Sequence, residues 1–235
     1  MKKDTSHIAV LFFSRSASAE AQNKIFTVDN HSPKNDQLAQ QLISHSRKQI
    51  VQSGLPFIEF DEQLQQGHDF GERFAHAFTT MFEMGYQHVI AVGNDTPELC
   101  SGHIEQAADL LLTGKADIIL GPAKDGGTWL TAYTKEAFDE RNFRQHPWQE
   151  KTLCSSLIQR YSEQFSVTTL ELLADIDDAH TLQSFIQRTS HKFPTLVCQL
   201  QSILATILSF GIEDSPPELP YISYRNNRLR APPLG

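Results

Sequence analysis

The sequence predicts an α/β fold with a mostly parallel sheet and helices on both of its faces. Short apolar segments alternate along the chain with longer segments of helical periodicity, which is the order that builds parallel sheets. The first apolar segment, residues 8–13, contains no polar residue, as expected for a strand that is covered on both faces. At 235 residues, the chain is long enough to bury a substantial core.

The N-terminal part continues this alternation. Residues 14–35 form a polar segment with weak periodicity. Residues 36–52 are predicted as a helix because apolar residues recur on one helical face, and Gly54 supplies the stop signal. Residues 55–60 are the second predicted strand.

The clearest helical segment covers residues 69–84. Gly85 follows it as a stop signal. Its apolar positions recur at helical spacing: Phe70, Phe74, Ala77, Phe78, Met81 and Phe82. We expect this aromatic stripe to pack in the core rather than to stack on a cofactor.

The second half of the chain repeats the pattern. Ser101 is a suitable N-cap for a helix that Gly114 ends. The predicted strands are 89–92, 118–120, a short one at 129–133, and 166–172. The predicted helices are 101–112, 149–165, and one that begins at Asp177 or Asp178 and reaches Arg188.

A further apolar helix is predicted at residues 194–210, and the chain is rich in proline from Gly211 onward. We therefore divide the chain into a domain of residues 1–192 and a C-terminal helix with its tail, residues 193–235. The helix either packs on the domain or mediates a homodimer, and the sequence leaves both open.

Composition excludes several classes of function. The net charge of −8 disfavours a sequence-independent nucleic-acid binder, which needs a basic face. A small basic cluster, Arg225, Arg228 and Arg230, lies in the proline-rich tail and is interpreted as solvated.

Cysteine usage and hydropathy indicate a cytoplasmic protein. The three cysteines are far apart and form no CxxC pair, which disfavours a disulfide framework or a structural zinc site. Residues 8–13 are too short for the apolar region of a signal peptide. No stretch approaches the roughly 20 apolar residues that a membrane span requires.

Two acidic loops point to a ligand site. Asp95 follows the strand 89–92, and Asp125 lies in a Gly/Pro-rich loop after the strand 118–120. Ligands of open α/β sheets bind beyond the carboxyl ends of the strands, so both acids are expected near a ligand. Asp95 is placed to hold Mg²⁺ or Mn²⁺, although an aspartate there can also simply cap a turn.

A third acidic patch, residues 175–178, follows the last predicted strand. One of its acids is expected to cap the next helix, and another could reach the metal. The Asp125-Gly126-Gly127 run lets backbone N–H groups approach a ligand, but Asp-Gly is also a strong hairpin signal.

Several motifs together resemble the bacterial DUF2064 family, whose members are glycosyltransferase-A-like (GT-A-like) transferases. The resemblance covers roughly residues 8 to 188. The matching segments, in order, are GHDFGER at 67–73, GNDTPEL at 93–99, GPAKDGG at 121–127, and the later segments 143–148 and 173–177. It implies a three-layer nucleotide-diphospho-sugar transferase fold with a C-terminal helical extension.

The resemblance also implies roles for the acids. Asp95 would ligate Mg²⁺ or Mn²⁺ on the nucleotide diphosphate, and Asp177 would be a second metal contact. Asp125, as the catalytic residue, would line the acceptor or sugar side with Gly126 and Gly127. No general base is identified.

The implied donor site departs from the family pattern in one loop. Gly71 and Arg73 would border the nucleotide pocket. After the first strand, the family carries a basic, Gly-containing loop of the form PGxxKTRL, which would cradle phosphates. Here only Arg15 and Lys24 offer positive charge, no glycine is present, and Glu20 would repel phosphate.

These features support a metal-dependent transferase that uses a nucleotide or nucleotide sugar and an unidentified acceptor. A glycosyltransferase-like protein is the first reading, and a nucleotidyltransferase of the guanylyltransferase type is a close alternative. The altered loop favours a third possibility, a non-catalytic GT-A-like binding module.

Overall fold

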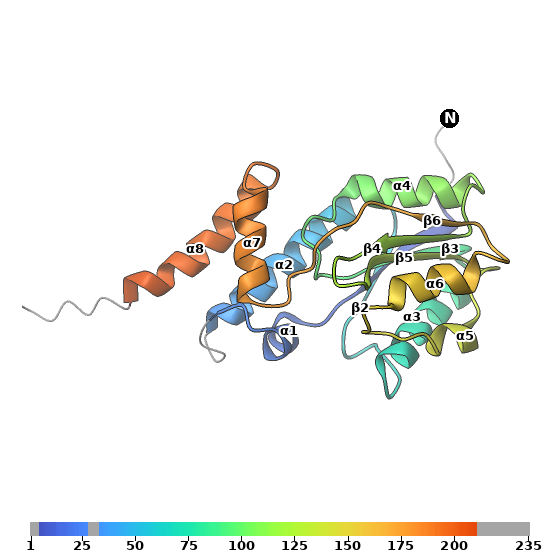
Figure 1. Ribbon diagram of the computed structural model, residues 1–235, viewed down its shortest axis with the longest axis horizontal. Helices are drawn as coiled ribbons and strands as arrows, with labels where there is room; N and C mark the ends of the chain where they lie inside the picture. Colours follow the sequence, from blue (N-terminus) through green and yellow to red (C-terminus); the bar gives the residue numbers. More distant parts are fainter. Residues whose placement is uncertain (1–4, 28–32, 211–235) are drawn as a thin grey trace, which may run out of the picture.

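The computed structural model describes residues 5–27 and 33–210, and it is a mixed α/β structure (Figure 1). Its elements in chain order are β1 (Ile8–Phe13), α1 (Ala17–Asn23), α2 (Pro33–Gln52), β2 (Phe57–Phe60), α3 (Phe70–Glu83), β3 (His88–Val92), α4 (Ser101–Leu112), β4 (Ile118–Pro122), β5 (Thr128–Thr134), α5 (Glu140–Arg144), α6 (Leu153–Tyr161), β6 (Val167–Thr169), α7 (Ala179–Thr189) and α8 (Pro194–Phe210).

The strands form one sheet in the order β2-β1-β3-β5-β4-β6. β1 pairs in parallel with β2 and β3, and β4 pairs in parallel with β6. β5 runs antiparallel between β3 and β4. The predicted mostly parallel sheet is therefore confirmed, and β3 and β4 end at the same edge.

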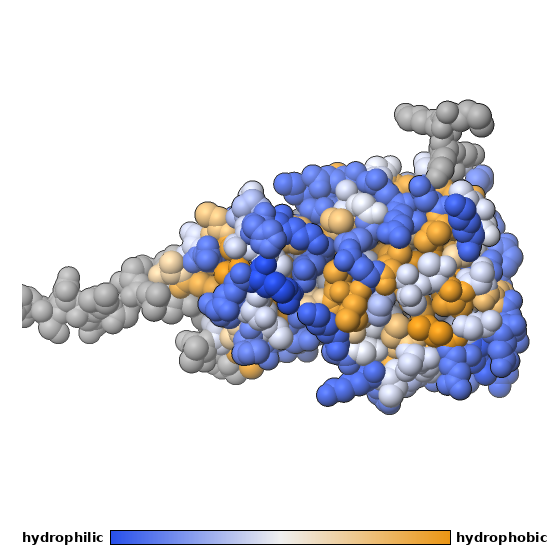
Figure 2. Space-filling model, turned by 45° about the horizontal axis from the view of Figure 1, so that its top comes forward, coloured by the Kyte–Doolittle hydropathy of each residue, from blue (hydrophilic) through white to orange (hydrophobic). Residues whose placement is uncertain are grey.

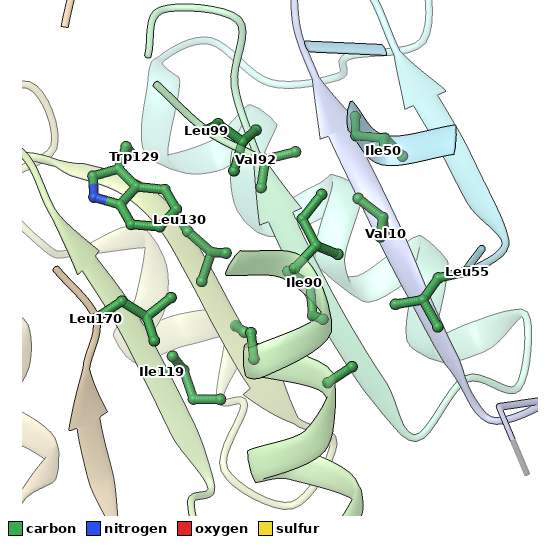
Figure 3. Packing of buried hydrophobic residues seen from close by; sticks show 14 of the residues in the cluster. Val10, Ile50, Leu55, Ile90, Val92, Leu99, Ile119, Trp129, Leu130 and Leu170 are labelled. Carbon is green, nitrogen blue, oxygen red and sulfur yellow. The ribbon is translucent and has the colours of Figure 1, made fainter. Parts of the chain in front are cut away.

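Helices cover both faces of this sheet, as the unbroken apolar strands predicted. Val10 and Ile90 face α2 and α4 in one hydrophobic cluster, part of which Figure 3 shows together with Trp129 and Leu130 of β5. On the opposite face, Leu11 belongs to a second cluster, which also contains buried residues of α3, α5 and α6. Alternate residues of β1 thus enter opposite cores because successive side chains of a strand point to opposite faces.

The aromatic stripe of α3 packs in the second core. Phe78 is fully buried, and its ring meets those of Phe74, Tyr133, Phe138 and Phe143 at centroid distances of 5.2–5.7 Å. Such ring pairs stabilise a core beyond the area that they bury. The helix begins at Asp69, whose side chain accepts the Glu72 N–H.

A third, smaller cluster joins α1, α2, α7 and α8 at one end of the molecule (Figure 1). Leu196, Val197 and Leu200 of α8 are buried there against α2 and α7. The helix therefore packs on the rest of the chain. The homodimer and the division at residue 192 remain predictions.

Three local features differ from the expectations. The polar segment 14–35 contains α1, which is too short to show a helical period but has Ser16 as an N-cap. The helix predicted at 149–165 is shorter, because Gln149 takes a left-handed backbone conformation (φ 68°) before α6 begins. β6 stops at Thr169 instead of 172.

The face of the molecule in Figure 2 is mostly hydrophilic, with patches of apolar side chains among the polar ones. Within the described residues, no helix is long and apolar enough to cross a membrane. The predicted proline-rich tail and its arginines lie outside the described residues.

Candidate functional site

A cavity of about 230 Å³ lies beyond the carboxyl ends of β1 and β3, where sheet topology predicts a ligand. Four carboxylates line it, those of Asp95, Asp125, Asp175 and Asp177. Apolar and aromatic residues form the rest of its wall, chiefly Phe13, Phe70, Phe74, Trp129, Trp148 and Leu153. The predicted acidic loops thus converge on one cavity.

A backbone hydrogen bond joins the Asp95 loop to the third acidic patch, residues 175–178. The Ile176 N–H donates to the Asp95 carbonyl oxygen at 2.8 Å, so the loop after β3 is joined to the loop before α7. Asp178 caps α7 by accepting the Thr181 N–H at 2.8 Å. Asp178 is therefore the predicted helix cap, which leaves Asp175 and Asp177 to face the cavity.

Asp175 is the most deeply placed of these acids, and the motifs did not single it out. The Thr96 hydroxyl donates to its Oδ1. The pKa of Asp175 is raised to about 7, chiefly by burial and also by the neighbouring carboxylates of Asp95, Asp125 and Asp177, while the Thr96 hydrogen bond opposes the rise. In the sequence, Asp175 belongs to the acidic patch 175–178 and to the family-like segment 173–177, but no role was assigned to it.

Asp175 should make folding stability depend on pH when divalent cations are removed by a chelator. Its pKa rises from 3.8 to about 7 on folding, so stability falls as pH rises between these values and then levels off. We expect Asp175→Asn, which keeps an acceptor for Thr96, to gain up to about 4 kcal/mol relative to wild type between pH 4 and pH 8. Denaturant melts at four pH values measure this gain. A pH-independent difference would contradict it.

The Asp125 loop is a closed turn. Asp125 Oδ1 accepts the Gly127 N–H at 2.8 Å, and Ala123 N–H donates to Gly127 O at 3.0 Å. Gly126 has φ +95°, and a Cβ there would lie 1.9 Å from the Lys151 carbonyl oxygen. Gly126 is thus required by the fold of the loop, whereas Asp125 and Gly127 line the cavity.

Lys24 forms ion pairs with two of the carboxylates of the site, those of Asp95 and Asp177. Its Nζ is 2.8 Å from Asp95 Oδ1 and 2.8 Å from Asp177 Oδ1, and it donates to the Ile176 carbonyl at 3.0 Å. Its pKa is raised because the attraction of Asp95, Glu20 and Asp177 outweighs the effect of burial. In this structure the ammonium of Lys24 pairs with the predicted metal ligands rather than standing open to phosphate.

The other predicted donor-binding residues stand outside the cavity lining that the structure describes. The backbone of Gly71 packs on Trp148, which does line the cavity. Arg73 lies on α3 and Arg15 between β1 and α1, where its charge acts on Glu20 and Glu62. Gly71 therefore reaches the cavity only through Trp148.

The loop after β1 has an acid where an anion-binding loop was expected. The Ser16 N–H donates to Glu62 Oε2 at 2.7 Å, and its hydroxyl donates to Glu62 Oε1 at 2.5 Å. The Glu62 carboxylate therefore occupies the start of α1, where an anion-binding loop was expected.

Sequence reasoning missed the aromatic wall of the cavity. Phe70 and Phe74 were assigned to the core, and they also line the cavity with Phe13 and Trp148. Trp129 is 5% exposed and its indole N–H donates to the Glu171 carbonyl at 3.1 Å, so it is mainly a packed residue. A helical apolar period does not reveal which turn of a helix reaches the edge of the sheet.

The donor set of the cavity suits a divalent cation bound together with a phosphate. Within residues 5–27 and 33–210, no three acidic, histidine or cysteine side chains already form a metal site. Asp95 and Asp177 nevertheless share one cation, the Lys24 ammonium. Mg²⁺ and Mn²⁺ need few protein carboxylates and complete their shells with water and phosphate oxygens, so this pair fits such an ion.

Comparisons with known proteins identify the family and the fold. The family model described as "Uncharacterized protein conserved in bacteria (DUF2064)" matches residues 33–150. A search of the curated proteins finds no match. A proposed nucleotide-diphospho-sugar transferase from Desulfovibrio desulfuricans G20 has a similar structure, with a TM-score of 0.73 and 23% identity over 87% of this chain and 98% of that one.

Two further solved structures are more distant. A cytidylyltransferase from Leptospira borgpetersenii has a TM-score of 0.45 and 12% identity over 87% of this chain and 95% of that one. A mannosyltransferase from Pyrobaculum calidifontis, in complex with GDP-Man and Mn²⁺, has a TM-score of 0.40 and 10% identity over 86% and 75%. The first similarity shows that the fold is that of the nucleotide-diphospho-sugar transferases.

Proposed function

Because this chain belongs to the DUF2064 family and has a GT-A-like fold, we propose that it is a metal-dependent transferase that uses a nucleotide-activated donor. The observation that carries the proposal is the convergence of four carboxylates and an aromatic wall on one cavity beyond β1 and β3. We favour transfer of a sugar from a nucleotide sugar to an acceptor hydroxyl.

The charge of the cavity supports a cation requirement. Its described lining contains four aspartates and neither lysine nor arginine, so a nucleotide diphosphate alone would meet only like charge. Mg²⁺ or Mn²⁺ held by Asp95 and Asp177 would neutralise the diphosphate and stabilise its charge as it leaves.

The aromatic wall supports a place for the apolar faces of the donor. The ring centroids of Phe13 and Phe70 are 5.7 Å apart, and so are those of Phe70 and Trp148. All three residues line the cavity. Such a rigid wall can stack on a base or on a sugar ring. It would also exclude water from the donor.

Asp125 is proposed as the catalytic carboxylate on the acceptor side, with Gly127 beside it. In the proposed step, the acceptor oxygen forms a bond to the sugar carbon while the bond from that carbon to the diphosphate oxygen breaks. The hydroxyl proton passes to Asp125, and the nucleoside diphosphate leaves. The hydrogen bond from Gly127 to Oδ1 orients the Asp125 carboxylate.

The remaining residues are proposed to act on the donor through their charge or through a neighbouring residue. Lys24 is adjacent to the Asp95–Asp177 carboxylate pair and would act on the phosphates through its charge. Arg15 would act on the donor phosphates at a distance, through its positive charge. Gly71 would act by allowing Trp148 to pack closely, and Arg73 would border the same side on α3.

A thermal-shift screen tests the proposal directly. The purified protein is measured with nucleoside diphosphates, triphosphates and nucleotide sugars of each base, with and without Mn²⁺ or Mg²⁺. A ligand at 100 times its Kd stabilises the native state by about 2.7 kcal/mol, and we expect this only when nucleotide and cation are both present. Transfer to water or to an added acceptor is then assayed with the nucleotide sugar that binds.

A non-catalytic binding module is the second candidate, and one observation favours it. The Glu62 carboxylate occupies the start of α1, where a phosphate-binding loop would otherwise present its N–H groups. A folded protein that shows no shift with any nucleotide, with or without cation, would support the module and refute the transferase.

A further inference from the structure

Lys24 stands in for a cation at the site. Its ammonium contacts Asp95 Oδ1 and Asp177 Oδ1 at the same distance of 2.8 Å, while the lysine side chain is only 14% exposed. Asp95 and Asp177 are about half exposed and open to the cavity. One side of the carboxylate pair therefore faces Lys24, and the other faces the space for a donor.

Another acid, Glu20, lies close enough to pair with the Lys24 ammonium. Glu20 is on α1, one helical turn before Lys24, and its Oε1 is 3.5 Å from Lys24 Nζ. Glu20 is 4% exposed, and its Oε1 has no hydrogen-bond partner. A buried carboxylate oxygen that accepts no hydrogen bond is costly, even with the Lys24 ammonium 3.5 Å away. It gives Lys24 an alternative position in which the ammonium stays paired.

A metal ion and the ammonium would compete for the same two carboxylates. A divalent ion that binds Asp95 and Asp177 at about 2.0–2.1 Å would lie too close to Lys24 for both cations to share the pair. The repulsion between them is strong where water is partly excluded. Uptake of the ion therefore requires that Lys24 leave.

We propose that Lys24 is an internal counter-ion that closes the Asp95–Asp177 site, and that a divalent cation opens it by displacing the ammonium toward Glu20. This inference rests on the proposed function, because it assumes the cation site. It adds that the affinity for the cation is set by Lys24 and not only by the ligands.

Titration of the full chain with Mn²⁺ alone tests this, with free Mn²⁺ counted from its aqueous electron paramagnetic resonance signal. We expect Lys24→Met to bind Mn²⁺ at least about tenfold more tightly than wild type, because no ammonium has to be displaced. Lys24→Arg should bind it no more tightly than wild type, since the guanidinium keeps its charge and holds carboxylates in a fork.

Lys124→Met is the matched control. Lys124 is exposed and borders Asp125 and Asp177 from the far side, so this variant removes the same charge nearby without touching the pair. Its Mn²⁺ affinity should change by less than about threefold. An equal gain in Mn²⁺ affinity in Lys124→Met and Lys24→Met would mean that the loss of any nearby positive charge has this effect. It would overturn the inference.

The remaining outcomes separate the inference from the proposed function. Equal Mn²⁺ affinity in wild type, Lys24→Met and Lys24→Arg, with binding lost in Asp95→Asn, would overturn the counter-ion role and leave the cation site standing. Absence of Mn²⁺ binding in every variant would overturn the cation site itself. If Lys24→Met does not fold, the comparison of Lys24→Arg with wild type decides, and tighter binding by the arginine variant would contradict the inference.

Discussion

Asp95→Asn is expected to abolish cation-dependent nucleotide binding while the protein remains folded. The substitution keeps the size of the side chain and removes the charge that pairs with Lys24 and that we assign to the cation. Because the side chain is half exposed, the fold should lose little stability. We expect nucleotide affinity in the presence of Mn²⁺ to fall by about 100-fold or more, measured by calorimetric titration.

The control for this variant is Glu105→Gln on the exposed face of α4. It changes the net charge by the same amount away from the cavity, and its affinity should equal that of wild type. Circular dichroism and the unfolding temperature verify that both variants are folded. Undiminished nucleotide binding by a folded Asp95→Asn variant would show that Asp95 is not part of the site.

Gly126→Ala is expected to cause the largest loss of stability among the glycine substitutions near the site. The residue has φ +95°, and the added Cβ would lie 1.9 Å from the carbonyl oxygen of Lys151. Because the backbone fixes the position of a Cβ and the oxygen belongs to the main chain, a side-chain rotation would not relieve the contact. Backbone strain and overpacking together should lower the free energy of unfolding by about 2–5 kcal/mol, as measured by urea denaturation.

Gly114→Ala is a matched control for the conformational part of this effect. Gly114 also has a positive φ, +64°, but no atom lies within 4 Å of the added Cβ. It should cost only about 1–2 kcal/mol. Equal losses in the two variants would show that the contact with Lys151 does not control the loop.

Nucleotide binding by Gly126→Ala should also weaken, because the same turn holds Asp125 and Gly127 at the cavity. The turn is further tied to α6 by the Cys154 N–H, which donates to the Gly126 carbonyl at 3.0 Å. Binding measured well below the unfolding temperature separates this local effect from global unfolding.

Local sequence patterns were sufficient to predict most of the fold. The apolar run of β1 and the helical periods of α3 and α4 each reflect burial on a known face, so strands and helices could be assigned from them. The antiparallel direction of β5 was not assigned, although the Asp-Gly hairpin signal between β4 and β5 favours it, because a connection this short joins only antiparallel neighbours. α1 was missed because seven residues show too little of a helical period.

The candidate site could be predicted only in part. Asp95 and Asp125 were identified because each acid follows a buried strand, and the edge of a sheet brings such loops together. Asp175 and the aromatic wall were not assigned to the site. Their positions depend on how the loop before α7 and the end of α3 pack at that edge, which no local pattern encodes.

The sequence alone thus determined the family, the α/β class and the two acidic loops, because these follow from residue types at fixed spacings along the chain. Tertiary structure alone decided which charges meet. Lys24 and Asp177 are separated by more than half of the chain, yet one ammonium pairs with Asp177 and Asp95. Electrostatic interactions act over a few ångströms in space, so their partners are set by the packing of the loops and not by distance along the sequence.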